Sequence, residues 1–461
     1  MSLETTRPAW GTRMGFIFAA AGSAVGLGNI WKFPYITGEN GGGLFVLIYL
    51  GCVVLVGLPI MISEVMIGNR SQQSPVGAFQ FFRRGGSPWG IVGWFGVLAG
   101  FVLLSYYSIV AGWSLNYVYL ALSNSFHGLG AGAISGIFDE LYLSGARNLL
   151  WHTLFMCIVV VIVVGGVRKG IEKTCNLLMP LLFLIVFGIM IYSIFLPNHG
   201  FLKALDFIFY PHVEKLTHRG VLEALGHSFF TLSLGMGAMI TYGSYLSERK
   251  EILHSSFFIS ILDTVVALMA CMMIYPVVFA FGYDAEAGPG LVFKTLPLVF
   301  SQLPGGYLLS VLFFLLLAFA ALSSAISLQE VVTSTVIDRL NWNRRKATLI
   351  TASVIFIFGV PSALAGSGGL FSGWADIFGM NFFDSMDFLA SNWMLPLSGL
   401  FVAIFVGWAI SDSQRRDAFG AELHAKWKYD AFNMLVRYVT PAMVFLVFMH
   451  KIGFLKLIGL V

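Results

Sequence analysis

Two apolar stretches of the sequence carry glycine, serine, threonine and asparagine where a membrane-spanning helix ordinarily carries aliphatic side chains. They read "GSAVGLGNIWKFP" over residues 22–34 and "FFTLSLGMGAMITYGSY" over residues 229–245. Such residues favour an interrupted helix, whose freed amides attract a carboxylate and whose freed carbonyls coordinate a cation. Glycines four residues apart, as in the first stretch, also suit close packing of two helices. Because the second stretch shares the pattern, we expect two interruptions that together form a site within the membrane.

Hydroxyl groups of other apolar stretches are candidates for the same site. Ser323 and Ser324 are adjacent in "ALSSAIS", and such a pair suits a hard cation. A single mid-helix serine more often bonds to its own helix. Tyr106 and Tyr107 lie deeper than an interfacial aromatic belt. One of them is expected to offer its hydroxyl to a substrate, and the other to be a packed tyrosine.

Two acidic residues also lie within apolar stretches. Asp263, in "ISILDTVVAL", costs about 2.5–3.5 kcal/mol to insert at the centre of a helix on translocon scales, so it marks a functional site. Glu64, in "IMISEVMIG", lies nearer a helix end. We expect it to accept a hydrogen bond from the frayed backbone of a neighbouring helix, and a proton-carrying role for either acid is the alternative.

Membrane-spanning helices must position these residues. Of the 461 residues 57% are hydrophobic and 11% are charged, and the mean hydropathy is +0.83, whereas soluble proteins keep about 25% charged residues. The chain is therefore predicted to be an all-α polytopic membrane protein. We expect eleven spans, at about 13–36, 42–68, 90–122, 150–166, 172–195, 222–247, 254–282, 304–336, 347–365, 386–411 and 431–455.

Lysine and arginine are concentrated in segments on the same side as the N-terminus, such as Arg344, Arg345 and Lys346. The positive-inside rule therefore predicts a cytoplasmic N-terminus. The positive charge follows from this topology, so no nucleic-acid partner is expected. The lipid bilayer and a small-molecule substrate are the expected partners, and the residues give no indication of oligomeric state.

The sixth span follows the first by an odd number of spans, so the two interrupted helices run in opposite directions. Matching interruptions in two halves of a chain are typical of a 5+5 inverted repeat. The predicted parts are an N-terminal tail (1–12), a first repeat with spans 1–5 (13–196), an extracellular loop (197–221), a second repeat with spans 6–10 (222–411), and span 11 with a short C-terminus (412–461).

With these features the chain resembles the neurotransmitter:sodium symporters, in particular their bacterial amino-acid transporters. The resemblance extends from Arg7 to about Val447 and rests on "GSAVGLGNIWKFPY", "ENGGG", "FFTLSLGMGAMITYGSY", "ALSSAIS" and "FDSMDF". The Gly-Met-Gly sequence at 235–237, Asp263 and the missing twelfth span are similar to eleven-span members that carry several hydrophobic amino acids. The resemblance implies sodium-coupled symport by alternating access, with helices 1 and 6 broken.

It further implies two sodium sites, built from the oxygen ligands that hard cations prefer. The first would use the carbonyl of Ala24, the side chains of Asn29, Thr231 and Asp263, and the carboxylate of the substrate. The second would use the carbonyls of Gly22, Val25 and Ala320 with the hydroxyls of Ser323 and Ser324.

The resemblance also implies a site for an α-amino acid. Its carboxylate would meet the amides of Leu27 and Gly28 and the hydroxyl of Tyr107, and its ammonium would meet the carbonyls of Ala24, Phe230, Thr231 and Ser233. Its side chain would lie among Leu103, Tyr107, Phe230, Met236, Ser324 and Leu328. This last set carries no charge, so a charged side chain would be desolvated without a partner. We therefore expect neutral hydrophobic L-amino acids, both aliphatic and aromatic.

Gly26 is informative because of the side chain that it lacks. Monoamine-carrying members of the family place an aspartate there, which binds the amine of a substrate that has no carboxylate. Glycine at this position leaves that role to the carboxylate of the substrate and favours α-amino acids. Met236 is flexible and flanked by glycines, which suits a pocket for side chains of several sizes.

Asp263 also leads to an expectation about chloride. Many family members need chloride near the first sodium site, and a fixed acid replaces it in others. Two sodium ions and a zwitterion bring two positive charges into a site of low dielectric constant, and one fixed carboxylate offsets half of that charge. We therefore expect transport that does not depend on chloride.

The family pattern places an outer ion pair between Lys32 and Asp387, above a lid of Tyr107 and Phe230. Lysine stands where arginine is usual, and it lacks the planar fork, so a looser pair is expected. The cytoplasmic gate would consist of Arg7, Asp338, Trp10 and Tyr245. Each pair could instead be a surface salt bridge worth about 0–1 kcal/mol.

Other functions agree less well with these residues. The main alternative is a sensor of the same fold that binds an amino acid without transporting it, and a narrower alternative is a transporter restricted to aromatic amino acids. A channel is disfavoured because no ring of like charges is visible. An enzyme is not expected, since the sequence shows no nucleophile–base pair, HExxH or phosphate loop. The short termini and the family branch predict a bacterial inner membrane.

Overall fold

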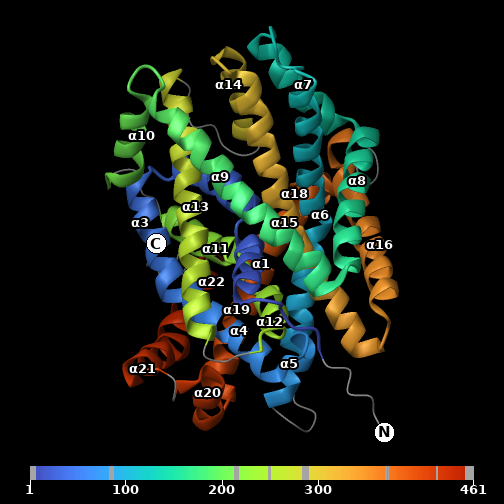
Figure 1. Ribbon diagram of the computed structural model, residues 1–461, viewed down its shortest axis with the longest axis vertical. Coiled ribbons are helices and arrows are strands. Elements are labelled where there is room, and N and C mark those ends of the chain that lie inside the picture. The colour runs from blue at the N-terminus through green and yellow to red at the C-terminus, as the bar shows by residue number, and fades with distance from the viewer. Residues whose placement is uncertain are drawn as a thin grey trace.

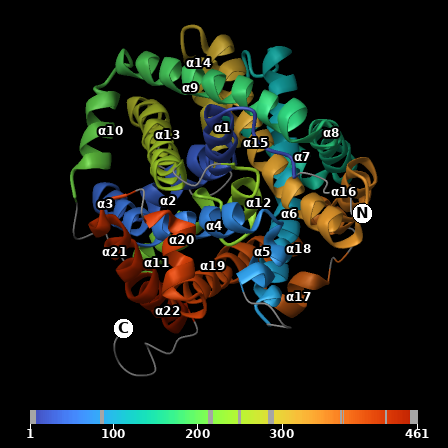
Figure 2. The same ribbon diagram turned by 60° about the horizontal axis from the view of Figure 1, so that its bottom comes forward.

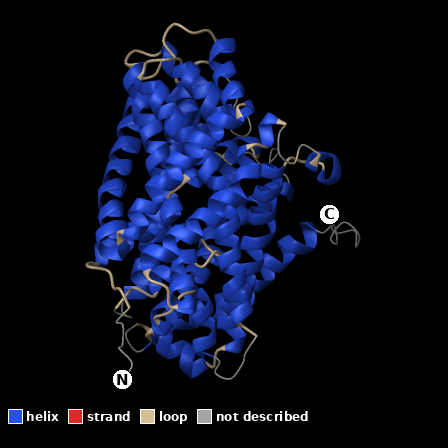
Figure 3. Cartoon of the chain, turned by 90° about the vertical axis from the view of Figure 1, so that its right-hand side faces the viewer, coloured by secondary structure: helices blue, strands red, loops and turns tan. Residues whose placement is uncertain are grey.

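The computed structural model describes residues 7–82, 88–211, 218–247, 251–282, 290–368, 371, 373–421 and 424–451. Within these ranges the chain forms helices joined by loops, with one isolated β-bridge between Gly42 and Pro211. Figure 3 shows helices along the whole length of the molecule. The prediction of an all-α architecture is confirmed.

The helices are named here in chain order, and π-helical turns continue several of them. The α-helices are α1 (Arg13–Ala24), α2 (Phe33–Glu39), α3 (Gly43–Cys52), α4 (Leu58–Ser71), α5 (Pro75–Phe82), α6 (Gly90–Leu122), α7 (Ala131–Leu143), α8 (Gly145–Val164), α9 (Lys173–Ile194), α10 (Gly200–Phe209), α11 (His218–Thr231), α12 (Ala238–Gly243), α13 (Ile252–Ala280), α14 (Leu296–Gln302), α15 (Gly306–Leu340), α16 (Arg344–Ala363), α17 (Trp374–Phe378), α18 (Phe382–Leu389), α19 (Leu395–Ile404), α20 (Asp412–Phe419), α21 (Lys426–Met434) and α22 (Thr440–Lys451). The π-helical turns include η1 (Gly28–Lys32), η2 (Val53–Gly57), η3 (Val167–Glu172), η8 (Ala390–Met394), η9 (Phe405–Ala409) and η11 (Leu435–Val439).

In the described part of the chain nine helical stretches are long and apolar enough to cross a bilayer, and one bent pair makes a tenth span. The sixth predicted span corresponds to α11 and α12, which are separated by a short non-helical segment. Each of the eleven predicted spans therefore has a helical counterpart. The division into repeats at 13–196 and 222–411 stays a prediction.

Most predicted span ends differ from the structure by a few residues, and for two of them a contact accounts for the observed end. The fourth span begins at Gly145 instead of 150, because the Ser144 hydroxyl accepts the Arg147 N–H and caps the helix. The sixth span ends at Gly243 instead of 247. There the Trp10 side chain donates to the Tyr242 carbonyl at 2.9 Å, so a residue from the N-terminal segment satisfies the end of the helix.

The first interruption lies between α1 and η1. Val25 leaves the helical conformation with φ −71° and ψ 96°, and the helix resumes at Gly28 with a bend of 48°. The Asn29 side chain stabilises the break, since its Oδ1 accepts the Gly26 N–H at 3.0 Å. The predicted break in helix 1 is confirmed.

The second interruption separates α11 from α12. Ser233, Gly235 and Gly237 adopt positive φ angles of 53°, 78° and 75°, a region that glycine enters without a steric cost. A Cβ at Gly235 would lie 2.4 Å from the carbonyl oxygen of Leu395, so glycine is required there for space as well as for conformation. The predicted break in helix 6 is confirmed.

The two broken helices lie inside the bundle. α1 packs against α9, α13 and α15; of the second broken helix, α11 packs against α3, and α12 packs against α4 and α15. Figures 1 and 2 show α1 and α12 among the longer helices. Figure 1 places the N-terminus with α5, α20 and α21 at one end of the molecule and α7 and α14 at the other. We call these the Arg7 end and the Lys32 end, after the ion pair that lies toward each.

Candidate functional site

Asp263 on α13 lies where both interrupted helices approach. Its carboxylate accepts hydrogen bonds from Asn29 Nδ2 at 2.7 Å and from Thr231 Oγ1 at 3.0 and 3.1 Å. Asp263 and Asn29 are fully buried. The Asp263 carboxylate and the Thr231 hydroxyl are oxygen ligands of the kind that hard cations prefer, whereas Asn29 contacts Asp263 through its amide nitrogen and accepts the Gly26 N–H with its Oδ1. Of the four residues predicted for the first sodium site, these three are brought into direct contact.

A second group of oxygen atoms lies between α1 and α15. The Ser324 hydroxyl donates to the carbonyls of Ser23 at 3.0 Å and Gly22 at 3.4 Å. The Ser323 hydroxyl donates to its own helix, at Phe319 and Ala320, each at 3.1 Å. Oxygen atoms from Gly22, Ala320, Ser323 and Ser324 are thus gathered, as predicted for a second sodium site. Val25, the remaining residue of that set, is buried at the end of α1.

Gly22 makes this approach of α1 to α15 possible. A Cβ at Gly22 would lie 3.2 Å from the Cβ of Ser323 and 3.1 Å from the sulfur of Met179. A larger residue would therefore separate α1 from α15 and move the carbonyl oxygens of α1 away from the serine hydroxyls of α15.

A cavity of about 20 Å³ borders the second group of oxygen atoms at Ser23 and Ser324. It is lined by Ser23, Ala24, Gly26, Gly28, Leu103, Tyr107, Phe230, Ser233, Met236, Ser324 and Leu328. Nine of these belong to the predicted substrate set. Of the other two predicted residues, Leu27 lines a neighbouring pocket and Thr231 faces Asp263. The lining formed by described residues is uncharged.

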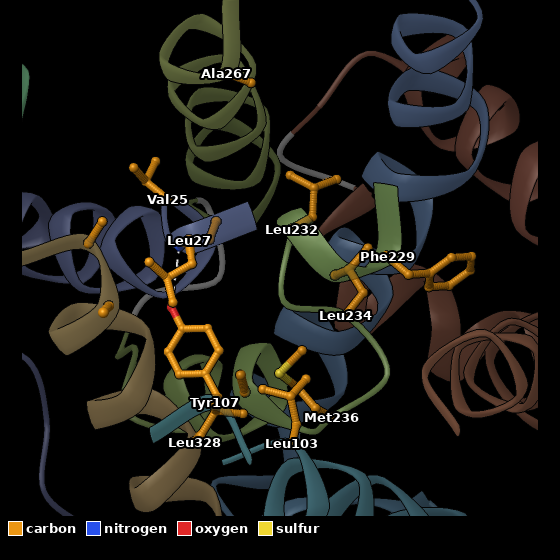
Figure 4. Packing of buried hydrophobic residues seen from close by; sticks show 14 of the residues in the cluster. Val25, Leu27, Leu103, Tyr107, Phe229, Leu232, Leu234, Met236, Ala267 and Leu328 are labelled. Carbon is orange, nitrogen blue, oxygen red and sulfur yellow. Dashed lines mark hydrogen bonds between the residues drawn. The ribbon is translucent and has the colours of Figure 1, made fainter. Parts of the chain in front are cut away.

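Tyr107 connects the cavity to the first interruption. The backbone amide of Leu27 donates to the Tyr107 hydroxyl at 3.3 Å. Figure 4 shows the ring between Leu27 and Leu328, with Met236 and Leu103 nearby. The hydroxyl of Tyr106 instead donates to Asp387 at 2.9 Å. Of the two candidate tyrosines, Tyr107 therefore faces the cavity and Tyr106 does not.

The site also uses groups that the sequence did not identify. The carbonyl of Ser23 accepts hydrogen bonds from both Ser324 Oγ and Ser233 Oγ, the latter at 2.7 Å, so it joins the two broken helices and α15. The hydroxyl of Tyr49 lies 3.4 Å from the Asp263 carboxylate. A backbone carbonyl gives no sequence signal, and Tyr49 lies in an apolar stretch where a packed ring is the default.

Glu64 on α4 stabilises the second interruption. Its Oε1 accepts the backbone N–H of Gly235 at 2.7 Å, and the side chain is fully buried. The expectation that Glu64 binds the frayed backbone of a neighbour is therefore confirmed. The contact satisfies an amide that the break in the helix leaves without a helical partner.

Toward the Lys32 end a pocket of about 190 Å³ lies above the cavity. Tyr107, Phe230 and Gly28 line both spaces and separate them. Lys32 Nζ lies 3.8 Å from Asp387 Oδ1 and 4.8 Å from the centre of the Phe230 ring. This Nζ–Oδ1 distance is long for an ion pair, which agrees with the looser pairing expected for lysine in place of arginine.

Toward the Arg7 end the cavity is closed more tightly. Arg7 Nη1 donates to both carboxylate oxygens of Asp338, at 2.8 and 3.0 Å, and its Nε donates to Ser244 at 2.9 Å. Trp10 packs edge-on against Tyr245 with ring centres 6.0 Å apart. All four predicted gate residues are thus assembled at one place, and the closure spans α12, α15 and the N-terminal segment.

A family comparison identifies the kind of protein that has this arrangement. Residues 7–128 and 136–458 match the model of the sodium:neurotransmitter symporter family. The chain belongs to this family. Its members are transporters, so the chain is a sodium-dependent symporter and not an enzyme, as the sequence indicated.

The symporter is also similar to individual proteins over nearly its whole length. The sodium-dependent transporter YhdH of Bacillus subtilis is 37% identical over 97% of this chain and 98% of its own. A sodium-dependent transporter of Haemophilus influenzae is 32% identical over 97% of this chain and 98% of its own. The crystal structure of MhsT in complex with L-phenylalanine matches with a TM-score of 0.89 and 41% identity, covering 96% of this chain and 99% of that one.

The Lys32–Asp387 contact yields a prediction for the symporter. We expect Lys32→Arg to tighten this pair, because a guanidinium can donate two hydrogen bonds to one carboxylate. Dissociation of labelled phenylalanine, used as the probe, should slow by less than about five-fold, since the pair is only partly buried and solvent-accessible pairs are worth about 0–1 kcal/mol. Lys294→Arg is the control, because Lys294 pairs with Asp139 on the surface at 2.7 Å. Faster dissociation from Lys32→Arg would contradict the role of Lys32 and Asp387 as an outer gate.

Proposed function

We propose that this symporter couples the uptake of neutral hydrophobic L-amino acids, aliphatic and aromatic, to two sodium ions and does not require chloride. The observation that carries the proposal is the uncharged lining of the central cavity, where Leu103, Met236 and Leu328 lie beside freed backbone groups. A charged side chain would lose its hydration there without gaining a partner. The similar protein MhsT forms a complex with L-phenylalanine, which supports an amino-acid substrate of this class.

In this proposal the carboxylate and the ammonium of the amino acid bind different backbone groups of the two broken helices. The amides of Leu27 and Gly28 and the hydroxyl of Tyr107 bind the carboxylate, because freed amides at a helix start carry partial positive charge. The ammonium is bound by the carbonyls of Ala24, Phe230, Thr231 and Ser233. Gly26 leaves room for this arrangement, since a Cβ there would lie 2.4 Å from Ser324 Oγ.

The sodium ions would occupy the two groups of oxygen atoms. The first ion is assigned to Ala24, Asn29, Thr231, Asp263 and the substrate carboxylate, which makes binding of sodium and amino acid mutually dependent. The second is assigned to Gly22, Val25, Ala320, Ser323 and Ser324. Because Asp263 provides a fixed negative charge beside the first ion, no chloride is required.

Transport would proceed by alternating opening of the two ends. The Lys32–Asp387 contact and the lid of Tyr107 and Phe230 close one side, and the Arg7–Asp338 pair closes the other. The excess of lysine and arginine supports a cytoplasmic Arg7 end. The bacterial relatives support an inner-membrane location.

A cavity of about 20 Å³ is smaller than the side chain of any proposed substrate, so the lining must move when an amino acid binds. Met236 is suited to this because its unbranched side chain adapts to different shapes, and glycines on both sides leave its backbone free to adjust. Substrates of different size are therefore expected to share the site.

Uptake into proteoliposomes tests the proposal. Labelled leucine, phenylalanine and tryptophan are supplied with sodium or potassium outside, with chloride or gluconate as the anion. We expect accumulation of all three that needs sodium and is unchanged in gluconate. Uptake of the aromatic pair alone would restrict the substrate class, sodium-dependent binding without accumulation would indicate a sensor, and uptake in potassium would refute sodium coupling.

A further inference from the structure

A second, much larger cavity lies apart from the central site. It has a volume of about 680 Å³ and is bordered by α1, α4, α13 and α21 at the Arg7 end. Figure 1 shows α21 at this end of the molecule, near α20. The volume falls within the range of about 300–1,000 Å³ that is typical of small-molecule sites.

One part of this cavity is cationic. Arg13 and Lys428 contribute fixed positive charge to the lining, together with His254, whose Nδ1 accepts from Arg13, His424, and one acid, Glu251. Glu251 pairs with Arg13 at 3.2 Å. The ammonium group of Lys428 lies 5.8 Å from the centre of the Trp427 ring. Because a single acid offsets only one of the two permanent cations, this part of the cavity favours an anion.

The remaining wall of the cavity is apolar. Leu58 and Ile62 of α4 face it, with Phe257 of α13 and Leu435 of η11. Phe257 is 53% exposed, and Trp427, at the cationic part, is 68% exposed. In a membrane protein an exposed phenylalanine contacts lipid, whereas tryptophan is enriched at the level of the headgroups. The cationic part of the cavity therefore corresponds to the lipid headgroups, and its apolar wall corresponds to the acyl chains.

We propose that this cavity binds one anionic phospholipid from the leaflet at the Arg7 end. The headgroup phosphate is held by Arg13 and Lys428, and an acyl chain lies along Leu58, Ile62 and Leu435. Polybasic groups at a membrane surface attract anionic lipids, and the apolar wall excludes a purely water-soluble ligand. The lipid would contact the first residue of α1, the helix that provides backbone groups to the central site.

Native mass spectrometry of the full-length chain tests this proposal directly. The protein is purified in detergent and mixed with equal amounts of phosphatidylglycerol and phosphatidylcholine. We expect one retained phosphatidylglycerol per chain in preference to phosphatidylcholine. Lys428→Gln should lower phosphatidylglycerol retention about five-fold, the loss expected for one cation near a membrane surface. Ala431→Phe, which places a ring in the cavity, should reduce the retention of either lipid.

Lys346→Gln is the matched control. Lys346 also lies over a tryptophan, at 4.3 Å from the Trp342 ring, and belongs to the first turn of α16, away from the cavity lining. This variant should retain phosphatidylglycerol as the wild type does. Equal retention of the two lipids by the wild type, or equal losses in Lys428→Gln and Lys346→Gln, would overturn the proposal. Neither result bears on the substrate, so the proposed function is tested separately.

Discussion

Replacing Asp263 by asparagine is expected to lower the apparent sodium affinity of transport about 10- to 100-fold. The amide has almost the same shape as the carboxylate and can still accept hydrogen bonds from Asn29 and Thr231, which now contact Asp263 at 2.7 to 3.1 Å. The fold should therefore persist while the negative charge is lost. Interactions with a charged group are worth about 1.5–3 kcal/mol, and each 1.4 kcal/mol corresponds to about a ten-fold change in affinity.

The measurement is the sodium dependence of leucine uptake at constant ionic strength, with choline as the replacement. Asp139→Asn is the matched control, because Asp139 is an exposed acid paired with Lys294 and its loss should leave the sodium dependence unchanged. A sodium dependence in Asp263→Asn equal to that of the wild type would refute the role of Asp263 as a sodium ligand.

Replacing Gly26 by alanine is expected to weaken substrate binding about 10- to 100-fold. A Cβ at this position would lie 2.4 Å from Ser324 Oγ and 3.1 Å from the hydroxyl of Tyr107. The new methyl group would therefore lie between the Ser324 hydroxyl, which is proposed to contact the second sodium ion, and the Tyr107 hydroxyl, which is proposed to contact the substrate. Overpacking of this kind costs about 1–3 kcal/mol, and the cost falls on the bound state because the substrate competes for the same space.

Binding of labelled phenylalanine to the purified variant in saturating sodium measures this effect. Gly226→Ala provides the control: Gly226 lies on α11, and a Cβ there would meet no atom within 4 Å. Equal affinities of Gly26→Ala and Gly226→Ala would show that the substrate does not use the space beside Gly26.

The broken helices were predictable because two apolar stretches share the same combination of glycine and hydroxyl residues, and such matching stretches are typical of interrupted spans. Residue types also indicated that Asp263 and the adjacent Ser323 and Ser324 belong to the candidate site. Backbone carbonyls gave no such signal, so the role of the Ser23 carbonyl as the acceptor for two hydroxyls emerged only from the packing of α1 against α12 and α15.

Long-range contacts account for other differences between prediction and structure. The sixth span was expected to continue to 247, but it ends at Gly243, where the side chain of Trp10 from the N-terminal segment donates to the Tyr242 carbonyl. The contact of Tyr49 with Asp263 joins residues 214 positions apart. The cavity at the Arg7 end depends on how α21 lies against α4 and α13. None of these arrangements is specified by a local pattern.

Equilibrium binding of labelled phenylalanine in a sodium titration, without a membrane or a gradient, is the most direct test of the central claim. That claim is that the two broken helices bind the amino acid together with two sodium ions. We expect steep sodium dependence with a Hill coefficient approaching two, which falls when either Asp263→Asn or Ser323→Ala is introduced. Binding that is equally strong when potassium replaces sodium would contradict it.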